Sequence, residues 1–194
     1  MKSLLPSYWL TEDLSRLSAL VPIQNIVFDE FEAQGISLSF KRDDLFSPQL
    51  GGNKFYKLHG HLRTAIRRFP GRPVASFGGA YSNHLYALAA AGKILNIKTI
   101  GVIRGERPST LGATLADLEA FGMTLVFLDR ETYRMRNDPD LLSLIERERL
   151  SHIEEAKSGC YWIPEGGGGI YGARGCMSIV HGALETSSKP IDYL

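Results

Sequence analysis

The hydrophobic and polar positions of this chain follow two different periods. Residues 36–41 alternate between apolar and polar side chains, which is typical of a half-buried strand. Further short apolar runs predict strands at 74–77, 98–103 and 123–128. Longer segments between them predict helices at 54–68, 83–93, 108–121 and 140–157, and 10–14 reads as a short capped helix. Strands that alternate with helices favour an α/β fold with a parallel sheet.

A turn and a helix start meet at Gly51-Gly52-Asn53-Lys54. Glycine tolerates a positive φ and asparagine can bond to its own backbone, so the first three residues indicate a turn. We expect Asn53 to cap the helix, which places Lys54 in its first turn. The helix dipole lowers the pKa of an ammonium group there, and a neutral amine is the form that attacks a carbonyl. Lys57 is expected on the same face; the alternative is a plain loop and helix with solvated lysines.

A second turn follows the strand at 74–77 and reads Gly-Gly-Ala-Tyr-Ser-Asn-His over 78–84. An alanine-rich helix comes after it, and the free N–H groups of a helix start carry a partial positive charge. The turn is therefore a natural seat for a carboxylate or a phosphate. Ligands of parallel sheets bind at the carboxyl ends of strands, which is where this turn lies. His84 is expected either to contact a substrate or to cap the helix.

The composition argues against several classes of function. The 194 residues are 44% hydrophobic and 22% charged, and no apolar run approaches the ~18 residues of a membrane span. A net charge of +1 offers no electrostatic reason to expect nucleic acid or an anionic membrane as a partner. Cys160 and Cys176 are too few for a zinc motif, and the five histidines show no ligand spacing, so no metal is expected. The N-terminus lacks the apolar core of a signal peptide, which favours a cytoplasmic location.

A glycine run offers a rival interpretation. Gly167, Gly169 and Gly172 match G-x-G-x-x-G after a possible strand at 161–163, which is the fingerprint of dinucleotide binding. A proline and a glutamate intervene between this strand and the glycines. Asp192, the acid at about the right distance, lies too near the end of the chain for a second strand to follow. The run therefore favours a bend over a dinucleotide site.

Three ordered motifs resemble the 1-aminocyclopropane-1-carboxylate deaminase and D-cysteine desulfhydrase family. They are Gly-Gly-Asn-Lys-Phe-Tyr-Lys-Leu at 51–58, the 78–84 turn, and the glycine-rich segment 163–175. Arg-Asp-Asp at 42–44 precedes them, as in the family, and we expect it to hold the lysine loop in place. The resemblance covers roughly residues 36–185.

The resemblance implies a cofactor, pyridoxal 5'-phosphate, and a role for each matching residue. Lys54 would form the Schiff base with the cofactor and move a proton at the substrate carbon, while Lys57 would hold the phosphate. Asn83 would bond the phenolic oxygen of the cofactor ring. Ser82, with Asn83 and His84, would contact the substrate, whose carboxylate Ser82 and the nearby N–H groups receive. Whether Ser82 is also a catalytic base or nucleophile stays open.

The resemblance also implies a fold: an open three-layer αβα arrangement with a mostly parallel sheet, like the tryptophan synthase β-subunit and called fold type II. Residues 1–52 would begin a large domain, 53–160 would form a small α/β domain, and 161–194 would return into the large one. Family members continue past this length, so the C-terminal part of the large domain would be missing.

The implied activity is that of a lyase or hydrolase that releases ammonia and a 2-oxo acid from a small amino acid. The resemblance does not choose between two activities, that of a D-cysteine desulfhydrase and that of a 1-aminocyclopropane-1-carboxylate deaminase. A homodimer is expected. The alternative is a shortened, catalytically inactive relative with weak or no cofactor binding.

Overall fold

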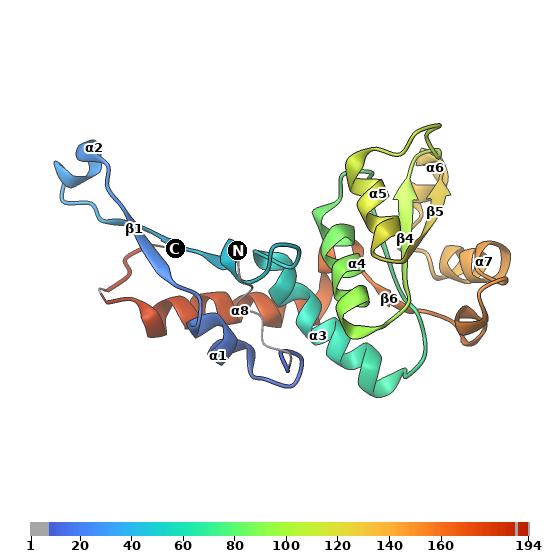
Figure 1. Ribbon diagram of the computed structural model, residues 1–194, viewed down its shortest axis with the longest axis horizontal. Helices are drawn as coiled ribbons and strands as arrows, with labels where there is room; N and C mark the ends of the chain where they lie inside the picture. The colour runs from blue at the N-terminus through green and yellow to red at the C-terminus, as the bar shows by residue number, and fades with distance from the viewer. Residues whose placement is uncertain (1–7, 189, 194) are drawn as a thin grey trace.

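The computed structural model describes residues 8–188 and 190–193 (Figure 1). The N-terminal segment in which no signal-peptide core was found lies mostly outside these residues. A parallel sheet with its helices forms one part of the molecule, and a projecting two-stranded arm forms the other. In the described residues no helix has both the length and the apolarity that a bilayer span requires.

The sheet has four parallel strands in the order β5-β4-β3-β6. They are β3 (Val74–Gly78), β4 (Thr99–Arg104), β5 (Met123–Leu128) and β6 (Tyr161–Ile163). The predicted strands at 74–77, 98–103, 123–128 and 161–163 are confirmed to within one residue at each end. The prediction works because a parallel strand that is covered on both faces reads as an apolar run, and β3 is buried at every position.

Helices cover both faces of this sheet, which makes the predicted three layers. On one face lie α3 (Asn53–Arg68), α4 (Asn83–Leu95) and α5 (Ala113–Ala120), with Val74 of β3 in their core. On the other lie α6 (Arg130–Arg134) and α7 (Pro139–Arg149), with Phe77 of β3 in theirs. Successive side chains of a strand point to opposite faces, so β3 contributes to both cores. The open αβα fold predicted for this part is confirmed.

Two predicted helices are too long. The helix expected over 108–121 begins only at Ala113, because Gly112 has an extended backbone and serves as its N-cap. The helix expected over 140–157 is α7, which ends at Arg149 and is followed by a separate short 3₁₀ helix, η2 (Glu154–Ser158).

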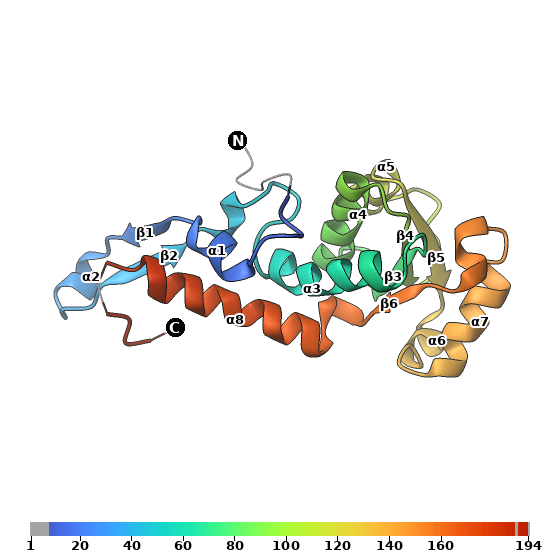
Figure 2. The same cartoon turned by 90° about the horizontal axis from the view of Figure 1, so that it is seen from below.

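The arm consists of β1 (Ile23–Ile26) and β2 (Leu38–Lys41), which pair antiparallel and are joined by α2 (Asp29–Glu32). Figures 1 and 2 show it projecting away from the parallel sheet. At its base lies α1 (Leu14–Ala19), with Asp13 as N-cap, so the helix expected at 10–14 begins where that prediction ended. The described residues also form the 3₁₀ helices η1 (Asp43–Leu45) and η3 (Glu165–Gly167).

The longest helix, α8 (Gly169–Thr186), connects the two parts. It runs back along α3 and α1 (Figure 2). Glycines permit the close approach: a Cβ on Gly175 would lie 2.0 Å from the carbonyl oxygen of Tyr56 on α3. We did not predict this helix.

Candidate active site

The first turn of α3 is set by Gly52. This glycine is the N-cap, with φ 64°, and no side chain caps the helix there. The predicted cap by Asn53 is wrong, because Asn53 is already helical and exposed, whereas a capping residue must have a non-helical backbone. Lys54 does lie in the first turn, as predicted.

The 42–44 segment anchors the loop before Lys54. The N–H of Gly52 donates to the carbonyl oxygen of Asp43 at 3.0 Å. The carboxylate of Asp43 accepts from the Tyr56 hydroxyl at 2.5 Å and from Lys41 Nζ at 3.0 Å. Burial and the bond to Asp43 raise the pKa of Tyr56, so this hydroxyl remains a donor. The predicted structural role of the segment is confirmed.

Lys54 and Lys57 are both half-buried, and neither ammonium group has a hydrogen-bond or ion-pair partner in the described residues. Burial is the main cause that lowers the pKa of Lys54; the charge of Lys57 adds to it and Cys176 on α8 opposes it. The predicted direction is confirmed, and desolvation by burial is its largest cause. Two unpaired, partly desolvated cations are an arrangement that favours an anionic ligand.

Ser82 is the N-cap of α4, where its side chain accepts from the N–H of Leu85 at 3.2 Å. Gly78 leaves room for it: a Cβ there would lie 2.6 Å from Ser82 Oγ. Asn83, the first residue of α4, is exposed and its side chain has no partner in the described part of the chain. Both residues therefore stand at the free N–H groups of a 13-residue helix, as the sequence predicts.

His84 lies beneath this helix start and not on the surface, with 2% of its area exposed. Its Nε2 is 2.8 Å from Ser76 Oγ on β3, and its Nδ1 has no partner in the described residues. Burial, followed by the charge of Lys54, lowers the pKa of His84 to about 3, so the ring is neutral. The capping role considered for His84 is wrong because Ser82 is the cap. Its substrate contact stays a prediction.

The glycine run forms a bend that is held on several sides. Glu165 accepts from the Tyr133 hydroxyl at 2.9 Å and pairs with Arg136 Nε at 2.5 Å. The carbonyl oxygen of Gly168 is 2.9 Å from His61 Nε2. A Cβ on Gly172, in α8, would lie 2.0 Å from the carbonyl oxygen of Gly167. These glycines thus serve a bend and close helix packing, which accounts for the pattern without a dinucleotide.

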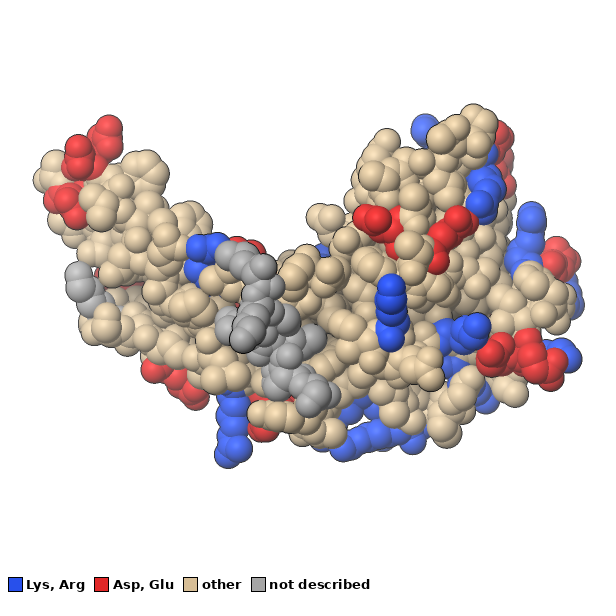
Figure 3. All heavy atoms as spheres, viewed as in Figure 1, with Lys and Arg blue, Asp and Glu red and all other residues tan. Residues whose placement is uncertain are grey.

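The site residues converge because α3, α4 and η3 contact one another, and β3 contacts both α4 and η3. Figure 3 shows a broad hollow between the arm and the sheet, with mostly uncharged visible walls. Ser76 and His61 also belong to this arrangement and were not predicted from the sequence. Ser76 could have been noticed because it is a serine inside an otherwise apolar strand. Nothing in the local sequence marks His61.

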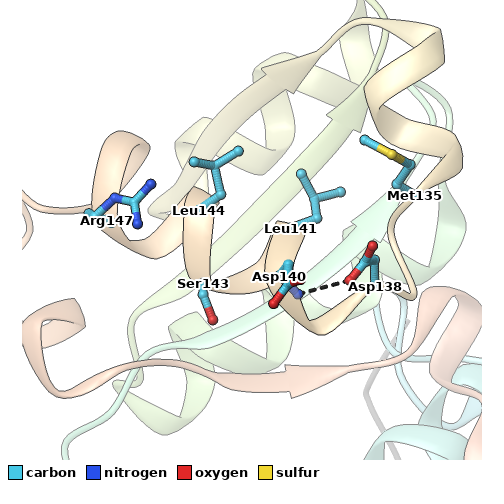
Figure 4. Close-up of a pocket in the computed structure, with 7 residues that line it drawn as sticks. All are labelled: Met135, Asp138, Asp140, Leu141, Ser143, Leu144 and Arg147. Carbon is cyan, nitrogen blue, oxygen red and sulfur yellow. Dashed lines mark hydrogen bonds between the residues drawn. The ribbon is translucent and has the colours of Figure 1, made fainter.

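A separate hollow of about 420 Å³ lies along α7 (Figure 4) and contains none of the predicted site residues. It is lined by Met135, Asp138, Asp140, Leu141, Ser143, Leu144 and Arg147. The carboxylate of Asp138 in this hollow already caps α7, because it accepts from the N–H of Asp140 at 2.9 Å. In the described part of the chain, no group of three or more His, Cys, Asp or Glu side chains could hold a metal ion.

No protein-family model matches the chain. It is 31% identical over 157 residues to a Pyrococcus abyssi protein provisionally named 1-aminocyclopropane-1-carboxylate deaminase, which is 81% of this chain and 44% of that protein. It is 28% identical over 147 residues to the bifunctional D-cysteine desulfhydrase/1-aminocyclopropane-1-carboxylate deaminase of Arabidopsis thaliana mitochondria, covering 73% of this chain and 35% of that one. The chain thus spans less than half the length of these relatives.

Solved structures show the same similarity. The crystal structure of a 1-aminocyclopropane-1-carboxylate deaminase homologue matches with a TM-score of 0.64 and 26% identity, over 87% of this chain and 49% of that one. A pyridoxal 5'-phosphate-dependent aspartate racemase matches with a TM-score of 0.56 and 16% identity, over 95% and 53%, and shows the fold alone.

The relatives are named as deaminases and a desulfhydrase, so the hydrolase class expected beside lyase is not supported. The fold is that of fold type II enzymes. By sequence and by structure, this chain is similar to proteins of the 1-aminocyclopropane-1-carboxylate deaminase and D-cysteine desulfhydrase family, and it corresponds to somewhat less than half of such a protein.

Proposed function

We propose that this chain carries the part of a pyridoxal 5'-phosphate site that contains the reactive lysine. The site would act on a small amino acid. One observation supports this most directly: Lys54 and Lys57 are half-buried, without acidic partners in the described residues, and near enough to His84 in the first turn of α4 to affect its pKa. An unpaired, partly buried cation is unfavourable until an anion or a covalent partner joins it.

The residues present suit a ligand with an aldehyde and a phosphate. Lys54, whose pKa is lowered, keeps a larger neutral fraction than an ordinary lysine and would be the point of covalent attachment. Lys57 would offer the phosphate a positive charge. Asn83, exposed and without a partner in the described region, would bond the ring oxygen.

The same site would hold a substrate. The free N–H groups of α4, with Ser82 at their head, would bind the substrate carboxylate. Once released from the cofactor, the Lys54 amine would move a proton at the substrate carbon. When bound, the cofactor supplies the sink for the electrons that this step leaves behind.

The resulting activity would release ammonia and a 2-oxo acid, with D-cysteine and 1-aminocyclopropane-1-carboxylate as the two substrates to compare. We propose a homodimer in the cytoplasm, with residues 53–160 as the small domain and 1–52 and 161–194 belonging to the large one. The second candidate is an inactive relative.

The test is covalent labelling. Protein is mixed with pyridoxal 5'-phosphate, followed by absorbance, reduced with borohydride and mapped by mass spectrometry. We expect a visible band and a label on Lys54, both absent in Lys54→Ala and kept in Lys98→Ala, which removes an exposed lysine. A label on another side chain, or none in folded protein, would overturn the proposal.

Activity is measured separately. Release of ammonia with pyruvate or 2-oxobutanoate from either substrate would support the enzyme. A Lys54 label without any release would favour the inactive relative.

A further inference from the structure

A buried polar chain lies under the lysine site. Ser76 is in the middle of β3 and fully buried, with its Oγ 2.8 Å from the carbonyl oxygen of Ile163 on β6 and 2.8 Å from His84 Nε2. A carbonyl oxygen only accepts, so the single hydroxyl proton of Ser76 goes to Ile163. Ser76 must then accept from His84, which places the ring proton of His84 on Nε2.

The other nitrogen of the ring is therefore a bare acceptor. Nδ1 of His84 is buried and has no partner in the described residues. A Cβ on Gly167 would lie 3.5 Å from this atom, 3.4 Å from Cε1 of the ring and 3.1 Å from Cβ of Lys57. The ring, the glycine bend and the stem of Lys57 thus meet at one point.

The charged groups around the ring keep it neutral. Lys54, Lys57 and His61, all on α3, oppose a proton on His84. Ser76 on β3 is uncharged, and the carboxylate of Glu165 on η3 is bound to Tyr133 and Arg136. In the described part of the chain, no acid is positioned to hold the ring as a cation.

We propose that His84 is a positioning residue for the lysine site. Its bond to Ser76 links the first turn of α4 to Ile163 at the end of β6. Its ring packs against Gly167, next to the side-chain stem of Lys57. The inference deepens the proposed function, because its consequence is correct placement of the lysines for the cofactor. Its structural part can be measured without any cofactor.

The first measurement is the tautomer. Ring nitrogen NMR of ¹⁵N-labelled protein between pH 5 and 8 should show His84 protonated on Nε2, bare on Nδ1 and not titrating. Ser76→Ala removes the acceptor and should let the proton move between the two nitrogens. A proton on Nδ1 in the wild type, or titration of the ring within this range, would contradict the assignment.

The second measurement compares two variants by amide hydrogen exchange. In His84→Gln the side-chain amide can replace the Nε2–H donor, whereas His84→Leu has similar bulk but no donor. The reporter is the N–H of Gly167, which donates to the Pro164 carbonyl oxygen at 2.9 Å, and the reference is the N–H of Leu142 in α7. We expect His84→Leu to speed exchange at Gly167 by about tenfold without changing Leu142, and His84→Gln to stay near the wild type. Unchanged exchange at Gly167, or an equal rise at both amides, would overturn the positioning role.

Cofactor titration then separates the two proposals. The concentration of pyridoxal 5'-phosphate at half-maximal absorbance should rise about tenfold in His84→Leu and little in His84→Gln. If the wild type shows no absorbance change at all, the proposed function fails. The tautomer and the exchange rates still decide the role of His84.

Discussion

At the scale of single residues, the candidate site depends on side chains that lack partners. Lys54 and Lys57 are not paired in the described residues, whereas Lys41 nearby is tied to Asp43 at 3.0 Å. The sequence alone predicted the place of Lys54 in the first turn of a helix and the direction of its pKa shift. It could not show that burial is the larger cause, because burial depends on which elements cover the first turn of α3.

Lys54→Met should stabilise the chain at neutral pH. The pKa of Lys54 is lowered from 10.5 by folding, so the folded state binds this proton less tightly than the unfolded state. The resulting penalty applies at low and neutral pH and disappears as the pH rises to 10.5. We expect the Tm of Lys54→Met to exceed that of the wild type by about 1–3 °C at pH 7. A difference that grows with pH, or a rise equally large in Lys98→Met, would refute this.

His84 should make the wild type sensitive to acid. Its pKa falls from 6.5 to about 3 on folding, so between these values the unfolded state binds a proton that the folded state does not. Stability therefore falls as the pH drops below 6.5, by about 1.4 kcal/mol per pH unit more in the wild type than in His84→Gln. Urea unfolding at pH 6.5, 5.5 and 4.5 measures both slopes. Parallel curves would show that the ring is not held neutral.

Ser82→Ala should weaken α4. Loss of an N-cap side chain costs about 0.5–2 kcal/mol, and Ser82→Asn, which keeps an acceptor, should lose little of it. Urea unfolding at pH 7 measures the difference. Equal stability of all three proteins would mean that the Ser82 bond to Leu85 contributes nothing.

At the scale of elements, the four strands were predictable and the longest helix was not. The strands are apolar runs because helices cover both faces of the sheet. The α8 helix carries Gly172, Gly175 and Gly182 among its buried positions, and glycine weakens the sequence signal of a helix. These glycines are required by the contact of α8 with α3, the bend and α1, which no local pattern reveals.

Gly175→Ala should destabilise the chain although alanine is the better helix former. Its Cβ would lie 2.0 Å from the carbonyl oxygen of Tyr56, which belongs to the backbone of α3 and cannot rotate away. We expect a loss of about 1–3 kcal/mol in urea unfolding, and less in Gly112→Ala, where nothing lies within 4 Å. A gain in stability in Gly175→Ala would show that the helices separate easily.

At the scale of the whole molecule, apolar side chains are exposed on both the arm and α8. Val27, Phe28 and Phe40 on or near the arm strands, and Met177 and Leu184 on α8, are each at least half exposed. Exposed apolar patches of this kind mark surfaces that associate. The arm and α8 are therefore the candidate surfaces for the proposed homodimer.

Light scattering tests the homodimer. We expect twice the chain mass of 21.5 kDa at high protein concentration. Met177→Glu with Leu184→Glu tests the α8 surface and Phe40→Glu tests the arm, and the variant that becomes a monomer identifies the interface. A mass of 21.5 kDa at every concentration would contradict the homodimer.

The sequence by itself determined the strands of the sheet, the position of Lys54 in a helix turn and the resemblance to a known family. These follow from local periodicity, turn chemistry and ordered motifs, which depend on neighbours along the chain. Only the tertiary structure decided that Gly52 and not Asn53 begins α3, that His84 lies beneath the site on Ser76, and that α8 closes against α3. Burial and hydrogen bonding between residues far apart in the sequence depend on the packing of whole elements, and the sequence of a single segment does not determine that packing.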